Sequence, residues 1–150
     1  MQIDGTPDRE RRAGTVGIIR RFDLDERGLT RVLGELESPI LQAIWELGQP
    51  TVKEVALALG PTTHIKTVMT VMNRMVEKDL LRRFRRGRHF IYTAYVDQET
   101  FMQQVADRVL SGLLADFGRP TLAHFVQEAS SEQLAELERL ISQRRIQEDA

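Results

Sequence analysis

The hydrophobic and polar positions of residues 62–78 separate onto two sides of a helix. On a helical wheel the polar residues fall within an arc of about 120°. That arc holds Lys66, Thr67, Thr70, Asn73 and Arg74, and the opposite, apolar side holds Ile65, Val68, Met69, Val71, Met72, Met75 and Val76. The pattern predicts a helix from about His64 to Lys78, with Met69, Met72 and Met75 filling the core.

An earlier helix is predicted to begin no earlier than about Glu35, because Pro39 is tolerated only near a first turn. Gly34 or Ser38 would open this helix, and Gly48 would end it. Its expected buried stripe consists of Leu36, Ile40, Leu41, Ala43, Ile44, Trp45 and Leu47.

A second, shorter helix is predicted from Val52 to Leu59, after a capping box formed by Thr51 and Glu54. Gly60-Pro61 stops it. Its expected buried residues are Val55, Ala56 and Leu59. A capped helix, a short turn and a helix with a bare polar face together make a helix-turn-helix.

Two short strands follow, Leu80 to Phe84 and His89 to Tyr95, joined by a turn at Arg86-Gly87-Arg88. The expected apolar anchors of this hairpin are Phe84, Phe90 and Tyr92. A hairpin appended to a helix-turn-helix makes a winged helix, and the tip of this wing is nearly all arginine.

From Asp97 the pattern becomes helical again. Asp97 would cap a helix reaching about Phe117, a break at Gly118 and Pro120 would follow, and a brief helix would cover Thr121 to Glu128. Ser130 and Gln133 form a second capping box before the last helix. Three amphipathic helices of about fifty residues in total cannot bury their apolar faces alone, so a second copy of the chain is the simplest partner. The predicted dimerisation surface consists of Phe101, Val105, Val109, Leu113, Leu114, Phe117, Leu122, Phe125, Leu134, Leu137 and Ile141.

The predicted fold class is mainly α, with an N-terminal winged helix-turn-helix, a small β-hairpin wing and a C-terminal helical dimerisation arm. Residues 1–31 are predicted to be a flexible extension, 32–96 the winged helix and 97–150 the dimerisation domain. Within the extension, the apolar residues could form a short strand or dock on the core, and the basic pairs could follow DNA phosphates. These residues are Val16, Ile18, Ile19 and Phe22, and the pairs Arg11–Arg12 and Arg20–Arg21.

The net charge of −1 hides an asymmetry between two parts of the chain. Residues 31–96 carry ten Lys and Arg against six Asp and Glu, whereas residues 97–150 carry five against ten. A basic middle suits a polyanion and an acidic end does not. The chain has no cysteine, no apolar run long enough to cross a bilayer and no export signal at its start, so we expect a cytoplasmic protein that does not insert into membranes.

The sequence lacks the motifs of common enzymes and metal sites. His64, His89 and His124 have no second histidine three or four residues away, and there is no GxSxG, P-loop or Rossmann fingerprint. We therefore predict no catalytic residue, no metal and no cofactor.

The polar face of the long helix and the arginine-rich wing predict binding to double-stranded DNA. Lysine, arginine, asparagine and hydroxyl groups reach phosphates and base edges. The predicted DNA-binding residues are Thr63, Lys66, Thr67, Thr70, Asn73, Arg74, Arg82, Arg83, Arg86 and Arg88. Of these, Thr67, Thr70, Asn73 and Arg74 would discriminate bases, and the basic residues would contact phosphates. Two alternatives stay open: a winged helix that docks on a protein without a DNA target, and a regulator that binds a small molecule at its arm.

Four segments resemble the penicillinase-repressor family of transcriptional regulators (BlaI/MecI, with the CopY branch). They are LGELESPILQAIWELG, TVKEVALAL, KTVMTVMNRMVEKDLL and GRHFIYTAYVDQETF, and the resemblance covers about residues 32–147. It implies a homodimeric repressor with a winged helix and a helical arm, bound to pseudo-palindromic operators with TACA/TGTA-like half-sites. It also implies operator contacts for Lys66, Thr67, Thr70 and Arg74, with the Arg86–Arg88 tip near a phosphate or minor groove.

The resemblance further implies an unusual route of induction. In that family a membrane sensor metallopeptidase triggers cleavage of the arm, typically at an Asn-Phe bond. The matching stretch here is LAHFVQEAS, which would place the cut between His124 and Phe125, with histidine where the family has asparagine. The CopY branch senses copper through cysteine pairs, which this chain lacks.

Overall fold

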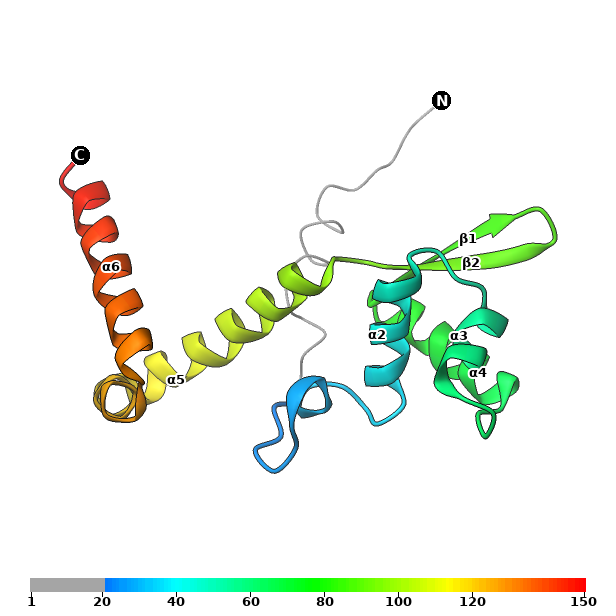
Figure 1. The fold of residues 1–150 in the computed structure, drawn as a ribbon, viewed down its shortest axis with the longest axis horizontal. Coiled ribbons are helices and arrows are strands. Elements are labelled where there is room, and N and C mark those ends of the chain that lie inside the picture. Colours follow the sequence, from blue (N-terminus) through cyan, green and yellow to red (C-terminus); the bar gives the residue numbers. More distant parts are fainter. Residues whose placement is uncertain (1–20) are drawn as a thin grey trace. The chain divides into compact units, whose positions relative to one another are not determined.

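The computed structural model of the protein describes residues 21–150 and divides into two compact units, one extending to Arg108 and the other from Val109 to Ala150. The expectations for Val16, Ile18 and Ile19, for the pair Arg11–Arg12 and for Arg20 lie outside the described residues. The elements in chain order are η1 (Gly28–Arg31), α2 (Glu37–Leu47), α3 (Val52–Leu59), α4 (Ile65–Glu77), β1 (Leu81–Arg86), β2 (His89–Ala94), α5 (Gln98–Glu128) and α6 (Ser131–Glu148) (Figure 1). The predicted fold class, a winged helix-turn-helix followed by C-terminal helices, is confirmed.

Helix α2 begins at a different residue from either of those predicted. Its N-cap is Leu36, and the Gly34 N–H donates to the Glu37 carboxylate at 3.2 Å. Ser38 is buried inside the helix rather than capping it. Gly48, with φ +84°, ends the helix as predicted, because a residue without Cβ adopts the left-handed region at little cost. Leu47, predicted to be buried, is 48% exposed because it is the last residue of the helix, where the packing ends.

Helices α3 and α4 form the helix-turn-helix, and both ends of the predicted capping box are present. The Glu54 N–H donates to Thr51 Oγ1 at 3.3 Å, and the Thr51 N–H donates to Glu54 Oε2 at 2.8 Å. Helix α4 ends in two backbone hydrogen bonds, Asp79 N–H to Val76 O at 3.1 Å and Leu80 N–H to Met75 O at 2.9 Å. With Asp79 at φ +58°, these bonds form a Schellman motif that turns the chain into β1.

The hairpin pairs β1 with β2 antiparallel, from Leu81 opposite Ala94 to Arg86 opposite His89. Gly87 has φ +62° and is the first of the two loop residues, the position at which a type II′ turn requires glycine. Because side chains alternate along a strand, the register assigns every hairpin residue to one of two sides. One side, here called the inner side, holds Leu81, Arg83, Arg85, Phe90, Tyr92 and Ala94, and the outer side holds Arg82, Phe84, Arg86, His89, Ile91 and Thr93.

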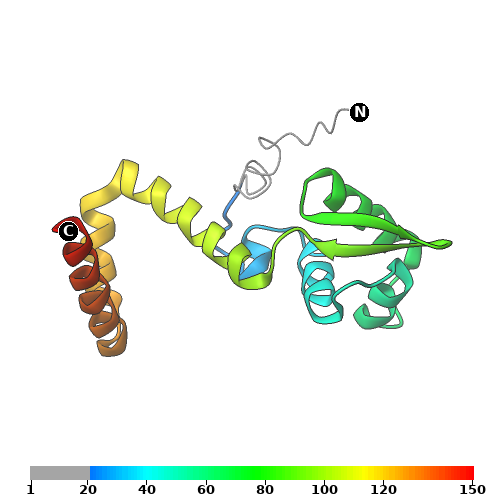
Figure 2. The same ribbon diagram turned by 90° about the horizontal axis from the view of Figure 1, so that it is seen from above.

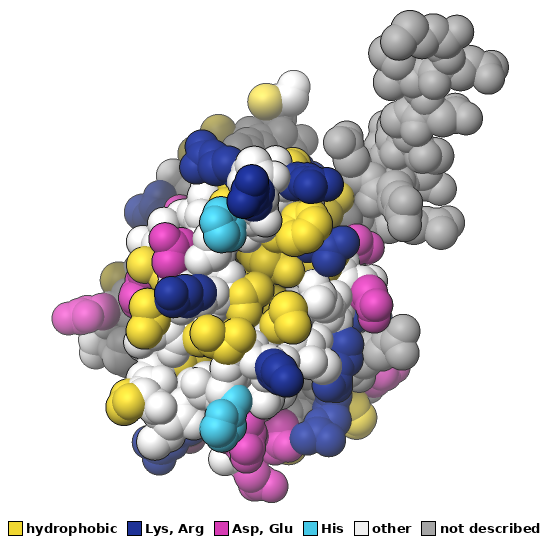
Figure 3. Space-filling view, turned by 90° about the vertical axis from the view of Figure 1, so that its right-hand side faces the viewer, with side chains coloured by type: hydrophobic (Ala, Val, Ile, Leu, Met, Phe, Trp, Pro, Cys, Tyr) yellow, Lys and Arg dark blue, Asp and Glu magenta, His cyan; other side chains and the backbone are white. Residues whose placement is uncertain are grey.

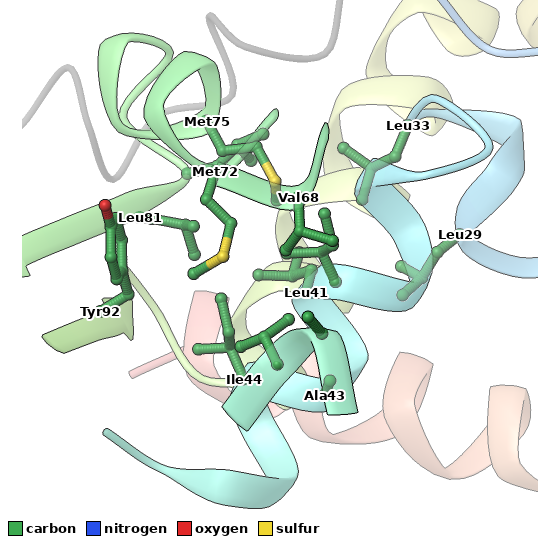
Figure 4. Close-up of a cluster of buried hydrophobic side chains, with 14 of the residues drawn as sticks. Leu29, Leu33, Leu41, Ala43, Ile44, Val68, Met72, Met75, Leu81 and Tyr92 are labelled. Carbon is green, nitrogen blue, oxygen red and sulfur yellow. The ribbon is translucent and has the colours of Figure 1, made fainter. Parts of the chain in front are cut away.

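The core lies where α2, α3, α4 and the base of the hairpin meet (Figure 4). Val68, Met72 and Met75 supply it from α4, as predicted, but Met69 is 43% exposed. Figures 1 and 2 show the hairpin extending past the helices, so only residues near its base are covered. Tyr92 is therefore buried as predicted, whereas the predicted anchors Phe84 and Phe90 are about half exposed.

Residues before α2 and after β2 also join this core. Leu29 of η1 is buried in it. At the other end, Phe101 in the first turn of α5 is only 5% exposed, with its ring centroid 5.6 Å from that of Trp45. Val105 packs against the same cluster. The prediction that Phe101 belongs to a dimerisation surface is therefore corrected, because its ring already fills the winged-helix core.

The second unit consists of the remainder of α5 and α6. The break predicted at Gly118 and Pro120 appears as a kink, because Phe117 has non-helical angles of φ −132° and ψ 35° within α5. The capping box of Ser130 and Gln133 opens α6, as predicted. None of residues 109–150 is buried, although the unit contains seven leucines and two phenylalanines. No helix within residues 21–150 is both apolar enough and long enough to cross a bilayer.

Candidate nucleic-acid interface

The outward face of α4 presents most of the predicted polar residues. Lys66, Thr67, Thr70 and Arg74 are exposed, and Thr63 is half-buried in the turn before the helix. The Thr70 hydroxyl donates to the Lys66 carbonyl at 2.9 Å, which leaves its oxygen lone pairs and methyl group for an external partner. The first turn of α4 has no acidic residue, so the positive end of the helix dipole is not offset there.

Asn73 has a different environment from the rest of the polar arc. It is half-buried, and its Oδ1 accepts hydrogen bonds from the Tyr92 hydroxyl at 3.0 Å and from Arg83 Nη1 at 3.2 Å. Both partners lie on the inner side of the hairpin. Its expected place on a free base-reading face is therefore corrected, since its carbonyl oxygen links α4 to the wing.

Two exposed apolar residues lie on the same side of α4 as Asn73. Ile65, Met69 and Asn73 are spaced four residues apart, so they follow one another along the same side of the helix. Ile65 and Met69 are both more than two-fifths exposed. Figure 3 views the side of the molecule that carries the hairpin and α4, and hydrophobic side chains gather at its centre with Lys and Arg around them.

The arginines of the hairpin separate onto two sides. On the inner side, the Arg83 guanidinium lies 4.8 Å from the centroid of the Phe90 ring. On the outer side, the Arg82 guanidinium lies 4.1 Å from the centroid of Tyr95. The predicted contacts therefore do not all point to one surface, because Arg82 and Arg86 lie opposite Arg83.

Arg85 is a candidate that the sequence-based list of site residues omitted. It alternates with Arg83 on the inner side, and its Nε donates to the Gly87 carbonyl at 3.3 Å. Strand alternation in the run of arginines would have indicated that Arg83 and Arg85 act together.

The basic groups of this surface lack acidic partners. Within residues 21–150, one ion pair involves a residue of the α4–hairpin region, Lys78 to Glu37 at 2.6 Å beside the end of α4. No carboxylate in that part of the chain pairs with the remaining basic residues, which are Lys66, Arg74, Arg82, Arg83, Arg85, Arg86 and Arg88. Their positive charges are thus available to a polyanion. Among the described residues, no three His, Asp or Glu side chains gather closely enough to hold a metal ion.

A winged helix with an exposed polar recognition helix and unpaired basic groups defines a regulator of the helix-turn-helix class. The family model described as penicillinase repressor matches residues 33–143 of the chain. The chain therefore belongs to the penicillinase repressor family, which confirms the resemblance found in the sequence. This is a family of transcriptional repressors and not of enzymes.

Individual relatives are similar over most of their length. The penicillinase repressor of Bacillus licheniformis is 22% identical over 115 residues, covering 74% of this chain and 90% of that protein. The transcriptional regulator BlaI of Mycobacterium tuberculosis is 28% identical over 127 residues, covering 77% and 86%. Among solved structures, the monomeric form of Bacillus licheniformis BlaI in complex with the blaP half-operator is 27% identical, with a TM-score of 0.39 over 45% of this chain and 85% of that chain.

Proposed function

We propose that this repressor binds a pseudo-palindromic DNA operator as a homodimer, with one winged helix on each half-site. The observation that carries the proposal is the set of basic side chains on α4 and the hairpin that have no carboxylate partner within residues 21–150. Such groups bind DNA by displacing counterions from phosphates. A recognition helix in the major groove and a wing beside it is the docking geometry that this fold supports.

Phosphate contacts and base contacts fall to different residues in this proposal. Lys66 and the hairpin arginines contact phosphates, with Arg82 and Arg86 doing so from the outer side of the hairpin and Arg88 from its turn. Thr67, Thr70 and Arg74 face the base edges, where a bidentate side chain is worth roughly 1–3 kcal/mol of discrimination. Ile65 and Met69, exposed beside them, are suited to contact thymine methyl groups.

The homodimer is proposed from the exposed apolar surface of residues 109–150. A groove of about 650 Å³ lies at the kink of α5 and the start of α6, and Leu113, Phe117 and Phe125 are among its lining residues. We propose that a second copy covers this surface, since contiguous exposed apolar patches mark interaction sites. The surface consists of Val109, Leu113, Leu114, Phe117, Leu122, Phe125, Leu134, Leu137 and Ile141, without Phe101. Val105, packed on the winged-helix core, would contribute only its remaining exposed part.

Induction is proposed to act on the arm in the cytoplasm, through cleavage of the His124–Phe125 bond triggered by a membrane sensor metallopeptidase. Both residues are exposed on the groove. They are also helical, and the Phe125 carbonyl accepts from the Ala129 N–H at 2.9 Å. A peptidase would therefore need this turn to unfold locally before cutting. The second candidate is a small-molecule effector in the same groove, which its apolar lining and His124 favour.

The experiment that tests DNA binding is a salt titration of affinity for a random-sequence duplex and for a palindromic duplex with TACA and TGTA half-sites. We expect tighter binding to the palindrome, and a log–log slope of about −0.9 for each phosphate neutralised. Arg86→Ala should weaken both duplexes alike and reduce the slope by about one unit, whereas Arg74→Ala should lower the ratio between them. Arg144→Ala, on α6, is the matched control and should change neither. Absence of binding to the random duplex at low salt would instead favour a winged helix that docks on a protein.

A further inference from the structure

The Asn73 carbonyl is occupied on the protein side of the recognition helix. Its oxygen has two lone pairs, and it accepts from two donors, Tyr92 and Arg83. Tyr92 is 2% exposed, so its hydroxyl needs a partner inside the protein, and Asn73 provides it. An asparagine that reads adenine uses its carbonyl and its amide group together. Asn73 cannot do so without giving up at least one of these hydrogen bonds.

Arg83 is held on two sides by neutral groups. One of its N–H groups donates to Asn73, and its guanidinium carbon lies over the Phe90 ring, 4.8 Å from the centroid. A guanidinium carries five N–H donors, so the remaining donors stay available to an external acceptor. No carboxylate within residues 21–150 pairs with Arg83, so its charge is not neutralised. A long side chain that is already ordered loses less conformational entropy when it binds.

We propose that Asn73 is a positioning residue that holds Arg83 against a DNA backbone phosphate between α4 and the hairpin. This inference rests on the proposed binding of DNA. Tyr92 and Arg83 donate separately to Asn73 Oδ1, and the bond from Arg83 orients the guanidinium that touches the phosphate. Asn73 therefore contributes affinity for any duplex and not discrimination between sequences, because phosphate contacts carry no base information.

Arg82 provides an internal comparison. It also stacks on an aromatic ring, that of Tyr95, but from the outer side of the hairpin. The hydrogen bond to Asn73 comes from Arg83 alone among the described arginines. Energetic coupling to Asn73 is therefore expected for Arg83 and not for Arg82.

The test is a double-mutant cycle in the full chain, with binding measured on the random-sequence duplex and on the TACA/TGTA palindrome. All variants carry Tyr92→Phe, so that removing Asn73 does not leave a buried hydroxyl without a partner. Asn73→Ala should weaken binding to both duplexes by about three- to tenfold, the range of one ordinary net hydrogen bond. In a protein that already carries Arg83→Ala, Asn73→Ala should lower affinity by less than twofold. In a protein that carries Arg82→Ala, Asn73→Ala should lower affinity by the full amount, about three- to tenfold.

Three outcomes would overturn the inference. Equal losses from Asn73→Ala with and without Arg83 would show that the two residues do not act together. A loss confined to the palindrome would make Asn73 a base reader. The third outcome is a melting curve showing that the Tyr92→Phe, Asn73→Ala protein is partly unfolded under the binding conditions, together with an unchanged affinity of Arg83→Gln. Because Arg83→Gln leaves Asn73 in place, these two results would make the role of Asn73 structural. If the unmodified chain binds neither duplex, it is the proposed DNA binding that fails.

Discussion

Phe101 lies against Trp45, with ring centroids 5.6 Å apart and planes inclined at 57°. The Trp45 indole N–H donates to the Val96 carbonyl at 3.0 Å, which holds the chain between β2 and α5 against α2. The start of α5 is therefore part of the winged-helix core, and the Phe101 ring is already covered within the chain.

Truncation of this ring should destabilise the winged helix. We expect Phe101→Ala to lower the free energy of unfolding by about 3–5 kcal/mol, because a buried aromatic ring is lost and a cavity remains. Denaturant unfolding followed by tryptophan fluorescence measures this directly at Trp45. Ser111→Ala, exposed in the second unit and outside the proposed dimerisation surface, is the control and should change that fluorescence transition little. If Phe101→Ala left the fluorescence transition unchanged but converted a dimer into a monomer, Phe101 would belong to the dimerisation surface after all.

The capping box of α3 should contribute measurable stability, because α3 supports the recognition helix. Thr51→Ala removes the acceptor of the Glu54 N–H and should cost about 1 kcal/mol in urea unfolding. Ser130→Ala removes the equivalent bond in α6 and should leave the transition of the winged-helix unit unchanged. Thr51→Ser keeps the oxygen and should restore most of the loss; failure to do so would argue against a capping role.

Asp97 should make the start of α5 sensitive to acid. The Thr100 N–H donates to its carboxylate at 2.7 Å, and this hydrogen bond lowers the pKa of Asp97 below its usual value. A lowered folded-state pKa means that the stabilisation is complete above the unfolded value of about 3.9 and is lost as pH falls through the folded value. Asp97→Asn keeps an acceptor that does not titrate. Melting temperatures measured from neutral pH down to the acid limit should fall less steeply for this variant than for the unmodified chain.

Met69 should contribute to sequence preference through the thymine methyl group. Replacement of thymine by uracil in the half-site removes only that methyl, and each buried methyl is worth about 0.8 kcal/mol. We expect uracil to weaken binding of the unmodified chain several-fold and binding of Met69→Ala much less. Uracil placed outside the half-sites is the control. Equal sensitivity of both proteins at every position would exclude Met69 from this contact.

Disruption of the arm should convert tight binding to the whole operator into weak binding to separate half-sites. A charge at Leu113, which lines the apolar groove, should prevent a second copy from covering it. Leu113→Asp is then expected to sediment as a monomer. Its affinity for a single half-site should be unchanged, whereas its affinity for the full palindrome should fall, because two linked winged helices no longer bind together. Ser111→Asp, two residues earlier and exposed, is the matched control. A monomer that still bound the full palindrome at the original affinity would refute the proposed role of the arm.

A geometric cause explains the exposure of Met69, Phe84 and Phe90, which were predicted to be buried. Met69 and Phe90 belong to apolar patterns that correctly predict the buried sides of a helix and a strand. Whether a residue at the edge of such a side is covered depends on how far the neighbouring element extends. The hairpin extends past the helices, so Phe90 and Phe84 stay exposed. The hydrophobic periodicity of one element does not indicate how far a neighbouring element extends over it.

Local patterns sufficed for the elements themselves. The capping boxes, Gly48 at the end of α2 and the turn at Gly87 depend on interactions within a few residues, and each appears as predicted. The place of Phe101 and the hydrogen bonds of Asn73 depend instead on residues that meet only after folding. Asn73 lies nineteen positions from Tyr92, and Trp45 bonds to a carbonyl fifty-one positions away. Distances of that kind follow from the packing of whole elements, which is why these roles became visible only in three dimensions.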